Sequence, residues 1–108
     1  MDSDILLSII MPAHNEGRNL PSTLRKVIGV LSEAAIPFEI IVVNDHSQDD
    51  TPQAVNNISR DDPRVKLVEN IYQRGFGYAV RRGLEVFSLS APSMGRRIFG
   101  RQGLLLRY

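Results

Sequence analysis

The sequence contains no cysteine and no tryptophan, and only 6% of its 108 residues are aromatic. The lack of cysteine excludes a disulfide framework and a thiolate metal site. So few aromatic side chains argue against a stacking surface for single-stranded nucleic acid, and no nucleic-acid partner is expected. The apolar runs are too short to cross a bilayer and no signal peptide precedes the first of them, so we expect a cytoplasmic location.

Acidic residues are missing from the last part of the chain. Residues 88–108 contain four arginines and neither Asp nor Glu, whereas residues 1–87 contain nine Lys or Arg and twelve Asp or Glu. The apolar periodicity stops at the same point. We therefore expect one folded part over residues 1–87, and a basic, poorly ordered tail over residues 88–108 that lies outside the pattern of the rest.

Three apolar runs alternate with three helical patterns in the folded part. The runs are typical of short buried strands, and they cover residues 6–11, 40–43 and 65–68. Pro12 is expected to close the first strand. Apolar spacing predicts helices over residues 20–34, 52–59 and 78–87. This order predicts an α/β fold with a three-stranded, mostly parallel sheet and flanking helices.

A polar loop follows each expected strand, and these loops must share one edge of a parallel sheet, where such sheets bind ligands. Asp45 ends the central strand and could accept a hydrogen bond from a nucleobase or ribose, or bond its own backbone as a turn residue. Asp49 and Asp50 precede Thr51 and Pro52, which is more typical of a helix start than of a metal pair.

The other candidate side chains on these loops each have a plain alternative. His14 and His46 lack the spacing of a metal site, so a solvent-facing or substrate-contacting role is expected. Glu16 could be a general base or a solvated charge. The segment Gly75-Phe76-Gly77 precedes a helix as a phosphate-cradling loop does, but it lacks the full spacing of known phosphate motifs. The arginines around it could neutralise a diphosphate or form an ordinary basic helix face.

Three segments together resemble family 2 glycosyltransferases, and most closely the polyprenyl-phosphate sugar transferases of the dolichol-phosphate mannosyltransferase type. They read SIIMPAHNE (residues 8–16), EIIVVNDHSQDDT (39–51) and NIYQRGFGYAVRRGL (70–84). The resemblance implies a partial Rossmann-like fold of the GT-A type. It also implies transfer of a sugar, with inversion, from a UDP- or GDP-sugar to an acceptor, expected to be a polyprenyl phosphate.

The resemblance further implies which residues lie at the nucleotide-sugar. They come from the three strand-end loops, and they are Pro12, Ala13, Asn15, Glu16, Asp45, Arg74, Gly75, Gly77 and Arg81. No catalytic residue is assigned.

Two departures from the family pattern bear on activity. Asn44 stands where the family usually has the first of two aspartates. The acidic motif that holds Mg²⁺ or Mn²⁺ in the family would follow the third helix, and residues 88–108 contain no acid. We therefore assign this chain no metal or cofactor and read it as a truncated or frame-shifted member with little or no turnover.

Three alternatives stay open. The chain could be a non-enzymatic nucleotide-binding module or a non-functional gene fragment. It could also contact an anionic membrane surface through its basic tail, at the cytoplasmic face.

Overall fold

The computed structural model describes residues 7–90, 97–99 and 105–107, with side chains described for residues 7–87. Strands and helices alternate over most of this length. In chain order they are β1 (Leu7–Ala13), α1 (Leu20–Glu33), β2 (Phe38–Asn44), α2 (Thr51–Asp61), β3 (Val65–Glu69), α3 (Phe76–Ser90), β4 (Arg97–Phe99) and β5 (Leu105–Arg107). The three helices and three strands expected from the sequence are thus present.

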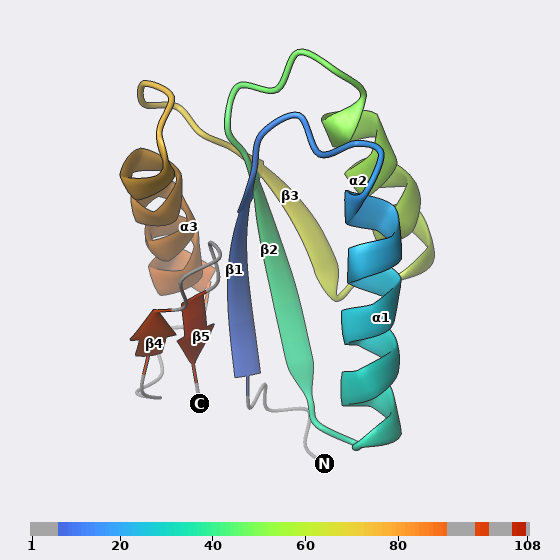
Figure 1. The fold of residues 1–108 in the computed structure, drawn as a ribbon. Coiled ribbons are helices and arrows are strands. Elements are labelled where there is room, and N and C mark those ends of the chain that lie inside the picture. Colours follow the sequence, from blue (N-terminus) through green and yellow to red (C-terminus); the bar gives the residue numbers. More distant parts are fainter. Residues whose placement is uncertain (1–6, 91–96, 100–104, 108) are drawn as a thin grey trace.

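The three longer strands form the expected parallel arrangement. The strand order is β3-β2-β1-β5-β4, in which β2 pairs in parallel with both β1 and β3. Figure 1 shows α1 and α2 on one side of these strands and α3 on the other. The α/β fold class with a three-stranded parallel sheet and flanking helices is therefore confirmed, and it fits a partial Rossmann-like fold of the GT-A type.

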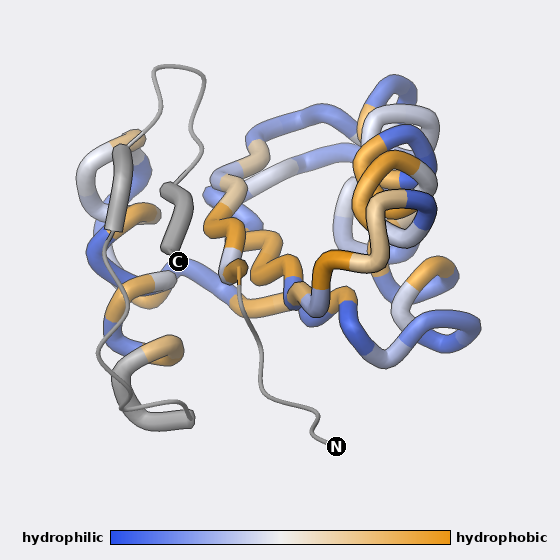
Figure 2. The backbone as a smooth tube through the Cα atoms, turned by 90° about the horizontal axis from the view of Figure 1, so that it is seen from below, coloured by the Kyte–Doolittle hydropathy of each residue, from blue (hydrophilic) through white to orange (hydrophobic). Residues whose placement is uncertain are grey.

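The central strand β2 is buried along its whole length because helices cover both of its faces. Successive side chains of a strand point to opposite faces. Ile40 and Val42 therefore pack in the cluster under α1 and α2, whereas Ile41 and Val43 pack in the cluster under α3 with Phe87. Seen along the sheet in Figure 2, the hydrophobic strands lie between two layers of helix. An unbroken apolar run was the right signal for this strand.

Strand β1 does not end at Pro12, as the sequence suggested, but continues to Ala13. Proline has no N–H to donate to a neighbouring strand. The carbonyl of Ala13 accepts from the N–H of Asp45 at 2.8 Å, so Ala13 faces β2 and Pro12 faces the opposite side. The pairing of β5 on that side reaches only as far as Ile10. Pro12 therefore stays in the strand without removing a ladder bond.

The two short strands are an addition that the sequence pattern did not predict. β5 pairs antiparallel with β1, and β4 pairs antiparallel with β5. Helix α3 also continues past Phe87 to Ser90. Most of residues 88–108 lie outside the described residues, so the expected boundary near residue 87 and the expected character of the tail stay predictions. Within the described residues, none of the helices is long and apolar enough to cross a bilayer.

Candidate functional site

Three loops leave the carboxyl ends of the parallel strands and meet at one edge of the sheet. We call them loop 1 (residues 14–19, between β1 and α1), loop 2 (residues 45–50, between β2 and α2) and loop 3 (residues 70–75, between β3 and α3). Figure 1 shows the three at the same end of the molecule. The topology therefore brings the polar segments singled out in the sequence to one place.

Asp45 connects loop 2 to loop 3. Its side chain is buried, and its carboxylate accepts a hydrogen bond from Asn70 Nδ2 at 2.9 Å and from the Gly75 N–H at 3.1 and 3.2 Å. Gly75 makes this approach with a φ of 149°, a conformation that favours glycine. These bonds leave part of the capacity of an ionised carboxylate for a further donor.

The sequence suggested that Asp45 could bond the backbone of its own turn, but the neighbouring Asn44 makes this bond. Its Oδ1 accepts from the Ser47 N–H at 3.2 Å, and its Nδ2 donates to Glu69 Oε1 at 2.8 Å. An aspartate at position 44 would place a second carboxylate against Glu69, and like charges directly opposite each other destabilise a sheet. The departure at Asn44 therefore fits the acidic residue on the adjacent strand.

Loop 1 is bound to loop 2 through Asn15. The backbone N–H of Asn15 donates to Ser47 Oγ at 2.9 Å, and Asn15 Oδ1 accepts from the Gln48 N–H at 2.7 Å. Asn15 has a φ of 54°, the left-handed conformation that asparagine tolerates better than most residues. Its side chain thus holds the two loops in register.

Asp49 starts helix α2 and also fixes loop 1. Its carboxylate accepts from the N–H and the hydroxyl of Thr51, and from the Gly17 N–H at 3.1 Å. The Thr51 hydroxyl also accepts from the Glu16 N–H at 2.9 Å. The hydrogen bond from the Thr51 hydroxyl is the main reason that the pKa of Asp49 lies below its ordinary value. The geometry supports the helix-start interpretation for Asp49, while Asp50 stands at the N-cap position without a side-chain capping bond.

Among the described residues, no three His, Asp or Glu side chains gather in a way that could hold a metal ion. The donor set therefore does not fit a Mg²⁺ or Mn²⁺ site within this part of the chain.

A pocket of about 380 Å³ lies among the three loops, lined by His14, His46, Gln48 and Arg74. His14 Nδ1–H donates to the carbonyl of Asp45 at 2.7 Å, so its Nε2 is the acceptor for Asn15 Nδ2 at 3.1 Å. These two bonds fit the tautomer that carries its proton on Nδ1.

The second histidine of the pocket joins loop 2 to loop 3. His46 Nε2–H donates to the carbonyl of Tyr72 at 2.6 Å. His46 has a φ of 56°, an uncommon conformation for a residue that is not glycine. The pocket walls are therefore held by hydrogen bonds between loops rather than by secondary structure.

The residues named from the sequence divide into three groups around this pocket. Arg74 lines it, while Asn15, Asp45 and Gly75 hold its walls. Pro12 and Ala13 belong to the end of β1, Glu16 is exposed with its N–H bonded to Thr51, and Gly77 and Arg81 belong to α3. His14, His46 and Gln48 were not among the named binding residues. The presence of two histidines on loops at one sheet edge was the available signal.

Tyr72 and Arg81 form a network with Glu85 beside the pocket. The Tyr72 hydroxyl donates to Glu85 Oε2, Arg81 Nε donates to the same oxygen at 3.3 Å, and the Arg81 guanidinium lies 4.4 Å from the centre of the Tyr72 ring. The bond from Tyr72 is the main cause that lowers the pKa of Glu85, and it raises the pKa of Tyr72. Arg81 therefore braces loop 3 against α3.

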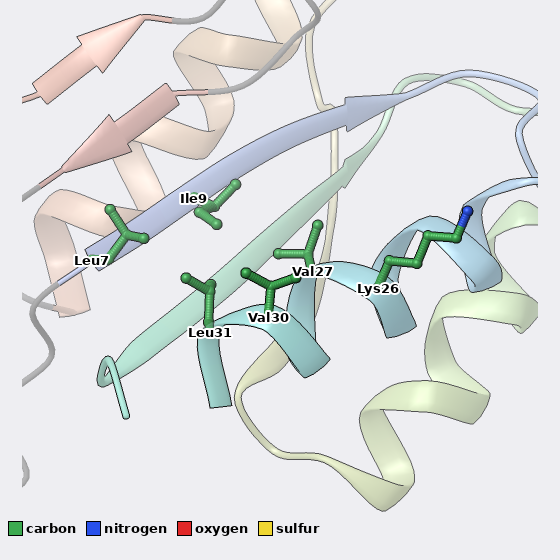
Figure 3. A pocket seen from close by; sticks show the side chains of 6 residues that line it. All are labelled: Leu7, Ile9, Lys26, Val27, Val30 and Leu31. Atoms are coloured by element: carbon green, nitrogen blue, oxygen red, sulfur yellow. The ribbon is translucent and has the colours of Figure 1, made fainter. Parts of the chain in front are cut away.

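A second cavity lies away from the loops, between β1 and α1. It measures about 350 Å³ and is lined by Leu7, Ile9, Lys26, Val27, Val30 and Leu31. Figure 3 shows the apolar side chains gathered between the strand and the helix, with the amino group of Lys26 pointing away from them. This cavity brings no polar groups together and offers no chemistry of its own.

The sequence model of glycosyl transferase family 2 matches residues 8–88. The chain is 40% identical over 85 residues to a dolichyl-phosphate beta-glucosyltransferase of Drosophila melanogaster, covering 72% of this chain and 26% of the relative. It is 36% identical over 88 residues to the Dictyostelium discoideum protein of the same description, covering 75% and 27%.

A third relative comes from Pseudomonas fluorescens. This undecaprenyl-phosphate 4-deoxy-4-formamido-L-arabinose transferase is 32% identical over 81 residues, which are 73% of this chain and 24% of the relative. The chain thus spans about a quarter of the length of the curated relatives it matches. The family match, the α/β fold and the three linked loops agree, and the chain belongs to glycosyl transferase family 2.

Proposed function

We propose that this chain binds the nucleotide-sugar donor of a glycosyl transfer reaction at the edge formed by loops 1, 2 and 3. The supporting observation is the pocket lined by His14, His46, Gln48 and Arg74 in a chain of this family. Its position at the carboxyl ends of parallel strands is where α/β sheets bind ligands. The donor is a UDP- or GDP-sugar.

Asp45, Arg74 and the first turn of α3 each have a chemical role in this proposal. The free acceptor capacity of Asp45 takes a donor from the base or the ribose. The Arg74 guanidinium offers paired N–H donors to the diphosphate. Two phosphate oxygens can accept these two hydrogen bonds side by side, in a bidentate pair. The first turn of α3, with Gly77, presents backbone N–H groups and the positive end of the helix dipole to the same anion. The remaining residues named from the sequence keep the loops in position.

The acceptor in this proposal is a polyprenyl phosphate, and the transfer inverts the anomeric carbon. Two of the matched relatives are described as dolichyl-phosphate transferases and a third as an undecaprenyl-phosphate transferase. Such an acceptor places the reaction at the cytoplasmic face of a membrane. We expect little or no turnover by this chain alone, because residues 88–108 offer no acid to hold the divalent cation.

Isothermal titration calorimetry with UDP-glucose and GDP-mannose tests the proposal, each with and without Mn²⁺. We expect saturable binding of one donor that Mn²⁺ does not change. Arg74→Gln should weaken it, because the change removes an exposed guanidinium at the pocket, whereas Arg60→Gln on α2 serves as the matched control. Asp45→Ala should abolish binding, with circular dichroism to check the fold.

The titration and a transfer assay together test the two rival functions. Sugar transfer to an added polyprenyl phosphate would exclude a non-enzymatic nucleotide-binding module, whereas binding without transfer agrees both with that module and with the little or no turnover expected of this chain. Absence of heat with either donor in a folded protein would overturn the binding proposal and favour a fragment without this function.

A further inference from the structure

The two histidines of the pocket differ in the ring nitrogen that each leaves for a ligand. His14 and His46 both line the pocket. His14 Nδ1 lies 2.7 Å from the carbonyl oxygen of Asp45. His46 Nε2 lies 2.6 Å from the carbonyl oxygen of Tyr72. A carbonyl oxygen only accepts hydrogen bonds, so each of these nitrogens carries a hydrogen. The second nitrogen of each ring therefore decides what that ring can offer to a ligand.

The second nitrogen of His14 is already occupied. Asn15 Oδ1 accepts from the Gln48 N–H at 2.7 Å, which fixes the orientation of the Asn15 amide. Asn15 Nδ2 is therefore the group that lies 3.1 Å from His14 Nε2 and donates to it. A hydrogen on His14 Nε2 would point at this NH₂ group and break the bond. His14 thus serves as an acceptor within the protein.

The second nitrogen of His46 has no such partner. His46 Nδ1 forms no hydrogen bond with any of residues 7–87, whose side chains the structure describes. The backbone at His46 has a φ of 56°, and uncommon backbone conformations of this kind persist mainly at functional sites. His46 can therefore gain a second N–H without losing a hydrogen bond.

The charges around His46 favour an anion in the pocket. Among the described residues, those that line the pocket include Arg74 but no acid. At the start of α3, Arg81 pairs with Glu85 rather than with the pocket. A positive His46 would share the pocket with the Arg74 guanidinium, and an anion between the two would stabilise both charges. The other charged or titratable side chains of the three loops lie outside the lining, and they are Glu16, Arg18, Asp45, Asp49, Asp50 and Tyr72.

We propose that His46 is a proton-dependent contact for the diphosphate of the donor. His46 takes a proton from the solvent on Nδ1 as the diphosphate binds, and the new N–H donates to a phosphate oxygen beside Arg74. This inference rests on the proposed function and adds to it a residue that binds the diphosphate. Proton binding and donor binding promote each other by the same factor. Donor affinity should therefore rise as the pH falls through the range in which histidine becomes charged.

Calorimetry with UDP-glucose and GDP-mannose tests this inference in two ways. The diester phosphates of these donors keep a constant charge between about pH 6 and pH 8, where histidine changes its own. We expect the affinity to be about tenfold higher at the lower pH, as expected for one charge-assisted hydrogen bond. The binding heat should also differ between two buffers with different heats of ionisation, because the proton taken by His46 comes from the buffer.

His46→Asn distinguishes protonation from a structural role. Asparagine tolerates the positive φ at this position, so loop 2 should keep its path. The variant should bind equally weakly at both pH values and lose the buffer dependence. His14→Gln, which changes the other histidine of the pocket, should keep both effects. If His46→Asn lowers the affinity by the same factor at both pH values and keeps the buffer dependence, the proposal is overturned.

Nuclear magnetic resonance identifies the ring that takes the proton. The sequence contains two histidines, so the proton spectrum has two imidazole Cε1–H signals, and the one missing from His46→Asn belongs to His46. Donor added at about pH 7 should move this signal towards the position of the doubly protonated ring. Donor binding that leaves the His46 signal in place, or moves the His14 signal in this way instead, overturns this inference alone. Absence of binding by either donor overturns the proposed function and this inference with it, so the two failures can be told apart.

Discussion

The carboxylate of Asp45 and the backbone N–H of Gly75, thirty positions apart in the sequence, lie 3.1 Å apart in the fold. This hydrogen bond joins the end of the central strand to the loop before α3. Gly75 has a φ of 149°, so the bond also depends on a residue without a side chain. The stability of loop 3 and the shape of the pocket both rest on this pair.

Asp45→Asn should destabilise the fold by about 1.5–3 kcal/mol, the range for hydrogen bonds to a charged group. The amide oxygen can still accept from Asn70 at the Oδ1 position, but its NH₂ at the Oδ2 position would face the N–H of Gly75, and the negative charge is lost. Urea unfolding should show a lower midpoint with an unchanged slope. Asp61→Asn, at the exposed end of α2, is the control and should move the midpoint little. Equal midpoints for the two variants would contradict the linking role of Asp45.

Two helix glycines should respond to alanine in opposite directions. Gly29 lies in α1 with nothing within 4 Å of an added Cβ, so Gly29→Ala should stabilise the protein by ~1 kcal/mol. A Cβ at Gly83 would lie 2.4 Å from Ile10 Cγ2 and 3.2 Å from Val43 Cγ2, so Gly83→Ala should cost about 1–3 kcal/mol. Thermal unfolding measures both. A gain in Gly83→Ala would mean that α3 packs less closely on the sheet than these two distances indicate.

The bond between Tyr72 and Glu85 should make stability depend on pH at both ends of the scale. Glu85 has a lowered pKa, so its contribution is complete above the ordinary value of 4.5 and is lost as the pH falls through the folded value. Tyr72 has a raised pKa, so its contribution is complete below the ordinary value of 10.0 and is lost as the pH rises through the folded value.

Tyr72→Phe should remove both contributions. The difference in melting temperature from the unmodified protein should therefore be largest between these limits and shrink towards strong acid and strong base. Tyr78→Phe, which removes a hydroxyl from the neighbouring ring, is the control and should show no such profile. A difference for Tyr72→Phe that stays constant with pH would speak against the network.

A buried carboxylate at the other end of the sheet gives a further prediction. Glu39 is 3% exposed, accepts from Ser8 Oγ at 2.6 Å and pairs with Lys66 Nζ at 3.0 Å. Lys66→Met leaves this carboxylate with a single partner and should cost about 1–3 kcal/mol. Adding Glu39→Met should recover part of the loss, because the buried charge is then removed. Chemical denaturation measures both, and a double variant less stable than Lys66→Met alone would contradict the argument.

The sequence predicted the elements because their signals are local. The β-branched run at residues 40–43 specified a strand covered on both faces, and apolar spacing found all three helices. Pro12 led to a wrong predicted end for the first strand, because the effect of a proline depends on which neighbouring strand its nitrogen faces. The pairing of β5 with β1 could not be predicted, because the apolar run at residues 104–106 is too short to classify.

The candidate site was predictable as a place but not in its detail. Parallel topology required the three polar loops to meet, and they do. Whether Asn15 or Asp45 faces a ligand or another loop depends on hydrogen bonds across the chain, which a sequence pattern does not specify. His14 of loop 1 and His46 and Gln48 of loop 2 line the pocket, and hydrogen bonds between the three loops fix their paths.

The bonds between the loops also bear on how the protein folds. They connect residues 25 to 35 positions apart, so none of them can form before the strands that carry the loops are aligned. A slip of one residue between β1 and β2 would turn every side chain of the slipped strand to the opposite face. Asn15 and Asp45 would then lose their partners together. We therefore expect the pocket to form only once the strands are in register, so that a misaligned chain should be unable to bind the proposed donor.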